Sequence, residues 1–206
     1  MNVINNIITK TIPFLPKKIV KIIADKYVAG ETTKEALKVI QNLNSKKYDI
    51  TIDLLGEHLN NAQEIDKVTN IYINLLDEIN KQSLSSNISV KPTHIGLDLE
   101  LEEFYKNALK LVKKAETLNN FIRFDMEHSG TTDDTINVFK RIYKNHKNIG
   151  TVFQAYLKRT YNDIDNMDQK INFRLCKGIY NENSNIAYKD KQKIIENYLR
   201  IAELAF

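Results

Sequence analysis

The sequence has very little cysteine, glycine, proline or tryptophan. Its 206 residues include one cysteine, Cys176, six glycines, three prolines and no tryptophan. A single cysteine excludes an internal disulfide and fits a reducing compartment. With so little glycine and proline, no linker or low-complexity stretch divides the chain. These absences favour one domain of ordinary size with a core of its own.

Long apolar runs and charge of one sign are also missing. No apolar stretch approaches the roughly 20 residues that a membrane-spanning helix needs. The formal net charge is only +4, and no arginine-rich arm of the kind found in nucleic-acid binders is present. The stretch 1–23 has apolar positions but neither a continuous hydrophobic segment nor a small-residue cleavage site. We expect an amphipathic helical lead-in, interrupted at Pro13 and Pro16, that packs on the protein, with contact to a membrane surface as the alternative.

Strand-like runs alternate with helical patterns along the rest of the chain. Each run is short, nearly continuous in apolar character and rich in β-branched or aromatic residues, as strands buried on both faces should be. The five runs are 48–57, 87–97, 121–129, 149–157 and 171–180. Successive β/α units predict a parallel sheet with right-handed connections.

Between these runs, apolar residues recur at the spacing of one helix face. The helical stretches are 30–43, 60–82, 101–118, 131–147 and 188–206. The first contains the capping box Thr32-x-x-Glu35, whose side chains satisfy backbone donors at the helix start. The fourth opens with Asp133 and Asp134, and acidic residues favour the positive end of a helix. Both signals indicate where these helices begin.

Two architectures agree with this order: an open doubly wound sheet and a closed (β/α)8 barrel. No G-x-G-x-x-G motif follows the first strand, so the dinucleotide-binding fold loses its main support. Polar residues instead gather at the carboxyl ends of several strands, where a barrel collects its active site. They are Asp53, Glu57, Lys91, Asp125, Glu127, Gln154, Arg174 and Lys177. We expect an α/β fold of the (β/α)8 TIM type with about five β/α units present, since a complete barrel needs about 250 residues.

Lys91 and Asp125 lie in apolar strand runs, where an unpaired charge is costly. Three roles are open to Lys91: a Schiff base if desolvation lowers its pKa, an ion pair with a carboxylate, or a buried stem whose ammonium reaches water. Asp125 needs a cation, and Lys91 on the neighbouring strand is its expected partner. Glu127 and His128 suggest a metal site. Because adjacent residues on a strand point to opposite faces, we expect no metal there.

The stretch NFRLCKGIY places Arg174 and Lys177 among apolar residues at a strand end. Either their charged ends extend to water, or they bind a ligand such as a phosphate or an electron-rich ring that gains negative charge. Gly178 lets the backbone approach such a ligand closely. Cys176 is better explained as a small buried hydrophobe than as a nucleophile, because no histidine lies in the same stretch. On the preceding strand, Gln154 can hydrogen-bond either the edge of a heterocycle or a backbone group.

Six motifs together resemble the proline dehydrogenase family. VAGET, DLLGE, SVKPT, FDMEHS, VFQAYLKRT and NFRLCKGIY occur in the family's order, roughly between residues 27 and 180. Several motifs in order are far more specific than any one of them. The resemblance implies a distorted barrel with noncovalent FAD, which oxidises L-proline to Δ1-pyrroline-5-carboxylate in proline catabolism and passes electrons to a quinone.

The resemblance also assigns roles to individual residues. Lys91 would contact the substrate, and Asp125 and Arg174 would be catalytic. The flavin-binding positions would be Met126, Gln154, Lys177, Gly178 and Ile179. Residues 1–45 would form an N-terminal helical segment and 46–206 the flavin-binding catalytic domain. The protein would be cytoplasmic, with peripheral contact at the inner face of the membrane as a further expectation.

The family's last three strands, and a final helix whose arginine pair clamps the substrate carboxylate, have no counterpart in these 206 residues. The sequence thus resembles about the first two-thirds of the family, and it does not separate proline from hydroxyproline as substrate. One alternative is a truncated, non-catalytic homologue that associates through exposed sheet edges. Another is a lyase that uses a Schiff base on Lys91.

Overall fold

The computed structural model of the chain describes residues 28–167 and 171–205. The helical lead-in expected at 1–23, with its interruptions at Pro13 and Pro16, lies outside the described residues. The chain divides into two compact units, Met1–Ile50 and Thr51–Phe206. No helix among the described residues is long and apolar enough to cross a membrane.

The first unit contains helix α3 (Thr33–Ser45), which begins at the predicted capping box. The Thr32 hydroxyl accepts a hydrogen bond from the backbone N–H of Glu35 at 3.3 Å. In return, Glu35 Oε2 accepts from the backbone N–H of Thr32 at 3.1 Å. Two backbone donors that the helix itself leaves unsatisfied thereby find acceptors. The capping box is confirmed.

We expect Thr32→Ala to lower the free energy of unfolding by about 1 kcal/mol, because the Glu35 N–H loses its acceptor. Thr32→Ser keeps the hydroxyl and is the matched control. Urea unfolding followed by circular dichroism measures the difference between the two variants. Equal stability of the alanine and serine variants would show that the capping box does not stabilise the helix.

The second unit is built on a five-stranded sheet whose spatial order is the chain order, β1-β2-β3-β4-β5. The strands are β1 (Ile50–Asp53), β2 (Ser86–Val90), β3 (Ile122–Phe124), β4 (Ile149–Gln154) and β5 (Asn172–Cys176). Ile50, the first residue of β1, is the last residue of the first unit. From β2 to β5 each strand runs parallel to its neighbour. Sequential parallel pairing is what successive right-handed β/α units produce.

All five strands expected from the sequence are present, but each is shorter than the predicted run. The runs predicted at 87–97 and 121–129 each contain a strand followed by a 3₁₀ turn, η2 (Pro92–Ile95) and η3 (Ser129–Thr131). Pro92 opens the first turn and removes a backbone donor, which ends the strand there. As a consequence, Lys91, Asp125 and Glu127 follow the ends of β2 and β3 and do not lie inside these strands.

Helices connect the strands. They are α4 (Ala62–Lys81), α5 (Leu101–Thr117), α6 (Thr132–Tyr143), α7 (Thr160–Asp165) and α8 (Lys191–Ala205). Four of these correspond to predicted stretches. The sequence did not reveal α7, because six residues are too short to establish a helical period.

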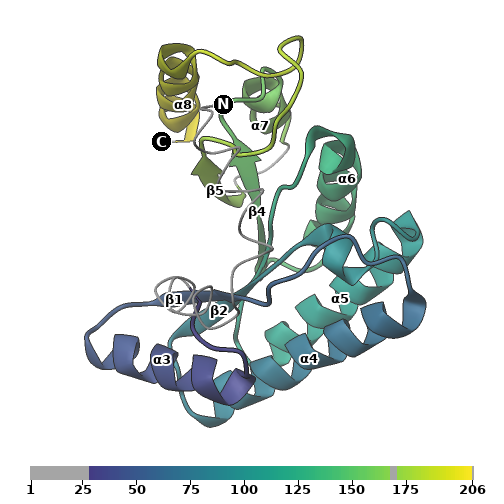
Figure 1. Ribbon diagram of the computed structural model, residues 1–206, viewed down its shortest axis with the longest axis vertical. Helices are drawn as coiled ribbons and strands as arrows, with labels where there is room; N and C mark the ends of the chain where they lie inside the picture. Colours follow the sequence, from purple (N-terminus) through teal and green to yellow (C-terminus); the bar gives the residue numbers. More distant parts are fainter. Residues whose placement is uncertain (1–27, 168–170, 206) are drawn as a thin grey trace, which may run out of the picture. The chain divides into compact units, whose positions relative to one another are not determined.

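The core forms between the sheet and the apolar faces of these helices. Helices α4 and α5 pack against each other (Figure 1), and the rings of Phe104 on α5 and Phe124 on β3 lie 5.4 Å apart. All six residues of β4 are buried, as expected for a strand covered on both faces. The inner strands are therefore rigid supports for the loops at their carboxyl ends.

Candidate active site

A cavity of about 470 Å³ lies at the carboxyl ends of β2 to β5. This volume falls within the range of about 300–1,000 Å³ that small-molecule sites occupy. The cavity is lined by Lys91, Asp125, Met126, Glu127, Val152, Gln154, Arg174, Cys176, Lys177, Gly178, Ile179 and Tyr180. All eight site residues predicted from the sequence are in this set. We call this hollow the strand-end cavity.

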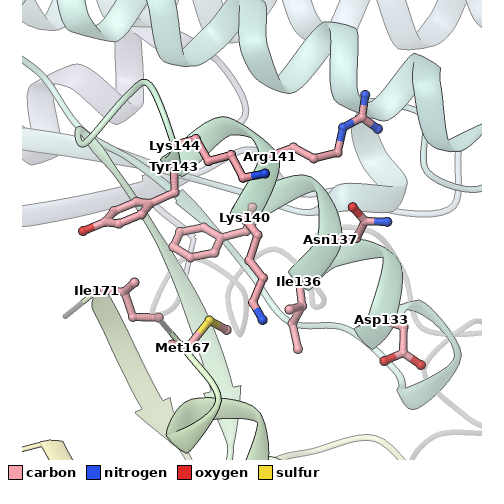
Figure 2. Close-up of a pocket in the computed structure, with 10 residues that line it drawn as sticks. Asp133, Ile136, Asn137, Lys140, Arg141, Tyr143, Lys144, Met167 and Ile171 are labelled. Atoms are coloured by element: carbon pink, nitrogen blue, oxygen red, sulfur yellow. The ribbon is translucent and has the colours of Figure 1, made fainter. Parts of the chain in front are cut away.

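A second cavity, of about 450 Å³, lies along α6 (Figure 2). Lys140 and Ile136 of α6 face Met167 across it in Figure 2. Arg141 on its wall is engaged elsewhere: the guanidinium pairs with Glu102 at 2.6 Å and lies over the Tyr105 ring. This cavity contains no residue from a strand's carboxyl end and none of the predicted site residues. We therefore place the candidate site in the strand-end cavity.

Strand register explains why these residues meet. Val90 of β2 lies beside Phe124 of β3, which lies beside Thr151 of β4. One residue further along, Val152 lies beside Arg174 of β5. One residue beyond Val90, Phe124 and Thr151, the same pairing places Lys91, Asp125 and Val152 side by side, and Arg174 continues this row on β5. Residues in one row of a parallel sheet point to the same side, so three charged side chains converge on the cavity.

Lys91 is held by Asp53, which ends β1. Its Nζ donates to Asp53 Oδ2 at 2.6 Å, and the Tyr72 hydroxyl donates to Asp53 Oδ1 at 3.4 Å. The predicted ion pair between Lys91 and Asp125 is therefore wrong. Lys91 has carboxylates on both sides, and the one on β1 binds it. Asp53 was named from the sequence as a strand-end residue, and its position on the strand next to Lys91 was the available signal.

The charge on Lys91 is stabilised by this arrangement. Burial acts to lower the pKa of Lys91, but the hydrogen bond and charge of Asp53, together with the charges of Asp125 and Glu57, raise the pKa above its usual value. A Schiff base requires a neutral amine, which burial without a partner would provide. Of the three roles open to Lys91, the ion pair is the one that the structure shows.

Asp125 binds Arg174 instead. Arg174 Nη2 and Ser89 Oγ each donate to Asp125 Oδ1 at 2.5 Å. The arginine reaches across β4 to do so, and its side chain remains 45% exposed. A guanidinium has five N–H donors, so this pair leaves donors of Arg174 for a ligand. Asp125 thus fixes the arginine at the cavity wall.

Glu127 and Gln154 organise the loop after β3. The Glu127 carboxylate is buried and accepts from the Thr93 backbone N–H at 2.8 Å and from the Thr93 hydroxyl at 2.7 Å. Gln154 Nε2 donates to the backbone carbonyl of Glu127 at 2.7 Å. Of the two roles open to Gln154, the structure shows the bond to the backbone. The loop that carries Met126 is thereby fixed at two points.

Three potential metal ligands lie beside this loop. Side-chain ligand atoms of Glu57, His58 and Glu127 are within 4.8 Å of one another. Because β3 ends at Phe124, Glu127 and His128 are on a loop, and the alternation argument used for the sequence does not apply to them. His58 Nδ1 is bonded to Asp98 Oδ2 at 2.7 Å. The absence of a metal stays a prediction, which activity after exhaustive chelation would test.

The contact between His58 and Asp98 predicts a pH effect on stability. The hydrogen bond that His58 donates to Asp98 raises the pKa of His58 above its usual value of 6.5; desolvation opposes this rise, and the charges of Asp98, Glu127 and Glu57 add to it. Because the pKa of His58 is higher in the folded state than in the unfolded state, protonated His58 stabilises the fold. This stabilisation is complete below about pH 6.5 and is lost as the pH rises through the folded-state pKa. Urea unfolding across this interval should show a decline in wild type that is smaller in His58→Gln.

Asp98→Asn is the second arm of this test. It removes the other member of the same contact, so it should reduce the decline as His58→Gln does, and the double variant should add nothing further. Identical pH slopes in wild type and His58→Gln would contradict the assignment.

The segment after β5 forms one wall of the cavity. Gly178 has φ +103°, and a Cβ there would lie 2.1 Å from Cδ1 of the Tyr156 ring. The glycine is thus required for close approach to a protein ring, in addition to any approach to a ligand. Burial raises the pKa of the Cys176 thiol, which keeps it neutral and fits the expected apolar role. Tyr180, also on this wall, was not identified from the sequence.

A β/α sheet whose spatial strand order follows the chain order, with charged side chains at its carboxyl edge, is typical of the class of β/α-barrel proteins. Within that class, the family model for proline dehydrogenase matches residues 36–203. The chain belongs to the proline dehydrogenase family, as the six motifs indicated.

Relatives of known name agree with this assignment. Proline dehydrogenase 2 of Bacillus subtilis (strain 168) is 35% identical over 182 residues, which are 88% of this chain and 60% of that protein. Proline dehydrogenase of Deinococcus radiodurans is 29% identical over 185 residues, covering 87% of this chain and 60% of that protein. The chain thus spans about 60% of the length of these relatives.

A solved structure shares the fold. Proline utilization A from Bdellovibrio bacteriovorus matches with a TM-score of 0.84 and 24% identity, over 91% of this chain and 24% of that one. The matched region is a TIM-barrel domain. The expected α/β fold of the (β/α)8 type, with about five units present, is confirmed.

Proposed function

We propose that this chain carries the site of an FAD-dependent proline dehydrogenase, which oxidises L-proline to Δ1-pyrroline-5-carboxylate. One observation supports this most strongly: the eight residues that the resemblance assigned to substrate, flavin and catalysis all line one cavity. Family membership and the names of the relatives agree with it.

The residues of the cavity fit a flavin ring. Arg174 and Lys177 are exposed cations at one wall, Met126 lies on the loop after β3, and Gln154 is the last residue of β4. Gly178 keeps the wall backbone free of a side chain, and Ile179 follows it on an exposed segment. These residues would hold the isoalloxazine, with Arg174 beside it. When bound, FAD supplies the hydride acceptor.

The protein's own contribution is electrostatic. Lys91 is kept charged by Asp53 and presents its ammonium to the cavity, where it would attract an anionic group of the substrate. Arg174, held by Asp125, and Lys177 would stabilise negative charge that develops on an electron-rich ring during the reaction. Arg174 is held by Asp125 before the reaction begins, so little reorganisation of its guanidinium is needed at the transition state.

The Schiff-base lyase is disfavoured, because the pKa of Lys91 is raised. We expect borohydride treatment in the presence of 2-oxo acids to leave the mass of the Lys91-containing peptide unchanged. In parallel, FAD, proline and a soluble quinone should yield a product with the mass and reactivity of Δ1-pyrroline-5-carboxylate. A reduced adduct on Lys91, with no such product, would favour the lyase instead.

The finer features of the function are proposals as well. The electron acceptor is a quinone, the catalytic domain is 46–206, and the segment 1–45 is its helical lead. The protein is cytoplasmic, and the basic, apolar stretch 1–23 gives peripheral contact with the inner face of the membrane. Family resemblance and the composition of that stretch support these points. A chain that does not bind flavin would instead be the non-catalytic homologue.

A further inference from the structure

The segment that follows β5 has little apolar packing to hold it. It carries four residues of the cavity wall, Lys177, Gly178, Ile179 and Tyr180. No side chain from 177 to 186 is buried, and Ile179 is 88% exposed. The Lys177 carbonyl accepts from the Tyr156 N–H at 2.8 Å, and beyond it the backbone next bonds to another part of the chain where Ala187 forms a bridge with Leu157. A segment with so few buried contacts is held mainly by its polar contacts.

The Glu182 carboxylate in this segment accepts hydrogen bonds from another β/α unit. Glu182 Oε1 accepts from the backbone N–H of Ser129 at 2.7 Å, and Glu182 Oε2 accepts from the Ser129 hydroxyl at 2.6 Å. Ser129 opens η3, immediately before α6, on the loop that follows β3. We call these two bonds the Glu182–Ser129 latch. It joins the loop after β3 to the loop after β5, and residues of both loops line the strand-end cavity.

The latch is charge-assisted. Burial acts to raise the pKa of Glu182, but the two bonds from Ser129 and the charges of His128 and Lys189 lower the pKa below its usual value. The carboxylate is therefore ionised at neutral pH, and bonds to an ionised acceptor are about twice as strong as neutral ones. Lys189 Nζ also donates to the Glu182 backbone carbonyl, which ties the segment to itself.

Ring contacts lie next to the latch. The rings of His128 and Tyr180 meet edge-on at 6.4 Å, and His128 stacks on His58 at 5.9 Å. His128 is the residue before Ser129, so the latch and the Tyr180 ring contact hold the same two loops at neighbouring points.

We propose that Glu182 is a positioning residue for the cofactor side of the site. This role rests on the proposed function. The latch holds Lys177–Tyr180 against the β3 loop, so that the cavity is formed before flavin binds. Preorganisation of this kind improves affinity because less ordering remains to be done on binding. Nothing in this role requires Glu182 to touch flavin or substrate.

The test compares FAD affinity, by quenching of flavin fluorescence, among variants of the full 206-residue chain. Glu182→Ala should weaken binding about 10-fold, because two bonds to a charged group are lost. Glu182→Gln should restore most of the affinity, since its amide can accept from the Ser129 N–H and donate to the Ser129 hydroxyl. Glu196→Ala, at an exposed glutamate on α8, is the matched control.

A double-mutant cycle separates positioning from general destabilisation. Ser129→Ala should weaken FAD binding, and combining it with Glu182→Ala should add less than the sum of the two effects. Wild-type FAD affinity in Glu182→Ala, or additive effects in the double variant, would overturn the proposal.

Failure of the proposed function gives a different pattern. If wild type binds no FAD, the rate of tryptic cleavage at Lys177 reports the latch directly. Faster cleavage in Glu182→Ala than in Glu196→Ala would show that the latch holds the segment in place, although the segment would then have no role in flavin binding. Equal cleavage rates would overturn the latch itself.

Discussion

Arg174→Ala should slow flavin reduction by proline about 100-fold or more, since removal of one preorganised donor typically costs a factor of about 10²–10³ in rate. The arginine lines the cavity, is held by Asp125 at 2.5 Å, and keeps donors free for a ligand. Its effect on stability should be small: a half-exposed ion pair contributes at most about 1 kcal/mol. Anaerobic stopped-flow reduction and urea unfolding of the same variant measure the two quantities.

Arg159→Ala is the matched control for this experiment. Arg159 also binds aspartates, Asp163 at 2.7 Å and Asp133 at 2.5 Å, and its side chain is 40% exposed. It does not line the strand-end cavity. We expect its replacement to affect stability without slowing flavin reduction. If Arg174→Ala lost activity only in proportion to folded protein, Arg174 would be a structural residue.

Asp53→Asn should be more damaging to the fold than Asp125→Asn. It leaves Lys91 half-buried without its hydrogen-bonded carboxylate. Removing one partner of a fully buried pair costs about 3–5 kcal/mol, and an exposed pair contributes at most about 1 kcal/mol. With Lys91 19% and Asp53 26% exposed, we expect a loss of about 2 kcal/mol. Urea unfolding measures this loss.

The pKa of Lys91 should also change in Asp53→Asn. Burial alone lowers the pKa of a lysine, so Asp53→Asn should move the Lys91 pKa downward, which NMR titration of the ammonium would detect. Lys91→Met combined with Asp53→Asn removes both charges and should recover part of the stability. A Lys91 pKa that moved only in Asp125→Asn would restore the pairing expected from the sequence and contradict the structure.

The sequence was informative where local signals decide the structure. Thr32 and Glu35 marked a helix start because a capping box acts within four residues. The strand-end residues could be placed together from the sequence alone, because parallel strands in a barrel put their carboxyl ends at one edge. Lys91, Asp125 and Arg174 are therefore neighbours in the structure, as predicted.

The sequence did not indicate which oppositely charged side chain each strand-end residue binds. Lys91 has Asp53 on one side and Asp125 on the other, and strand patterns do not say which carboxylate its flexible stem will reach. Arg174 crosses a whole strand to reach Asp125, a distance that depends on register. The contact between Glu182 and Ser129 joins residues 53 positions apart through two loops, and loops carry no periodic signal.

Visible absorption of the purified chain, mixed with FAD and then separated from unbound cofactor, tests the central claim most directly. We expect the flavin bands to remain with the protein and to bleach when L-proline is added without oxygen. Flavin that stays with the protein but does not bleach would contradict the assigned substrate. A colourless protein would contradict the claim that the strand-end cavity of this chain holds FAD.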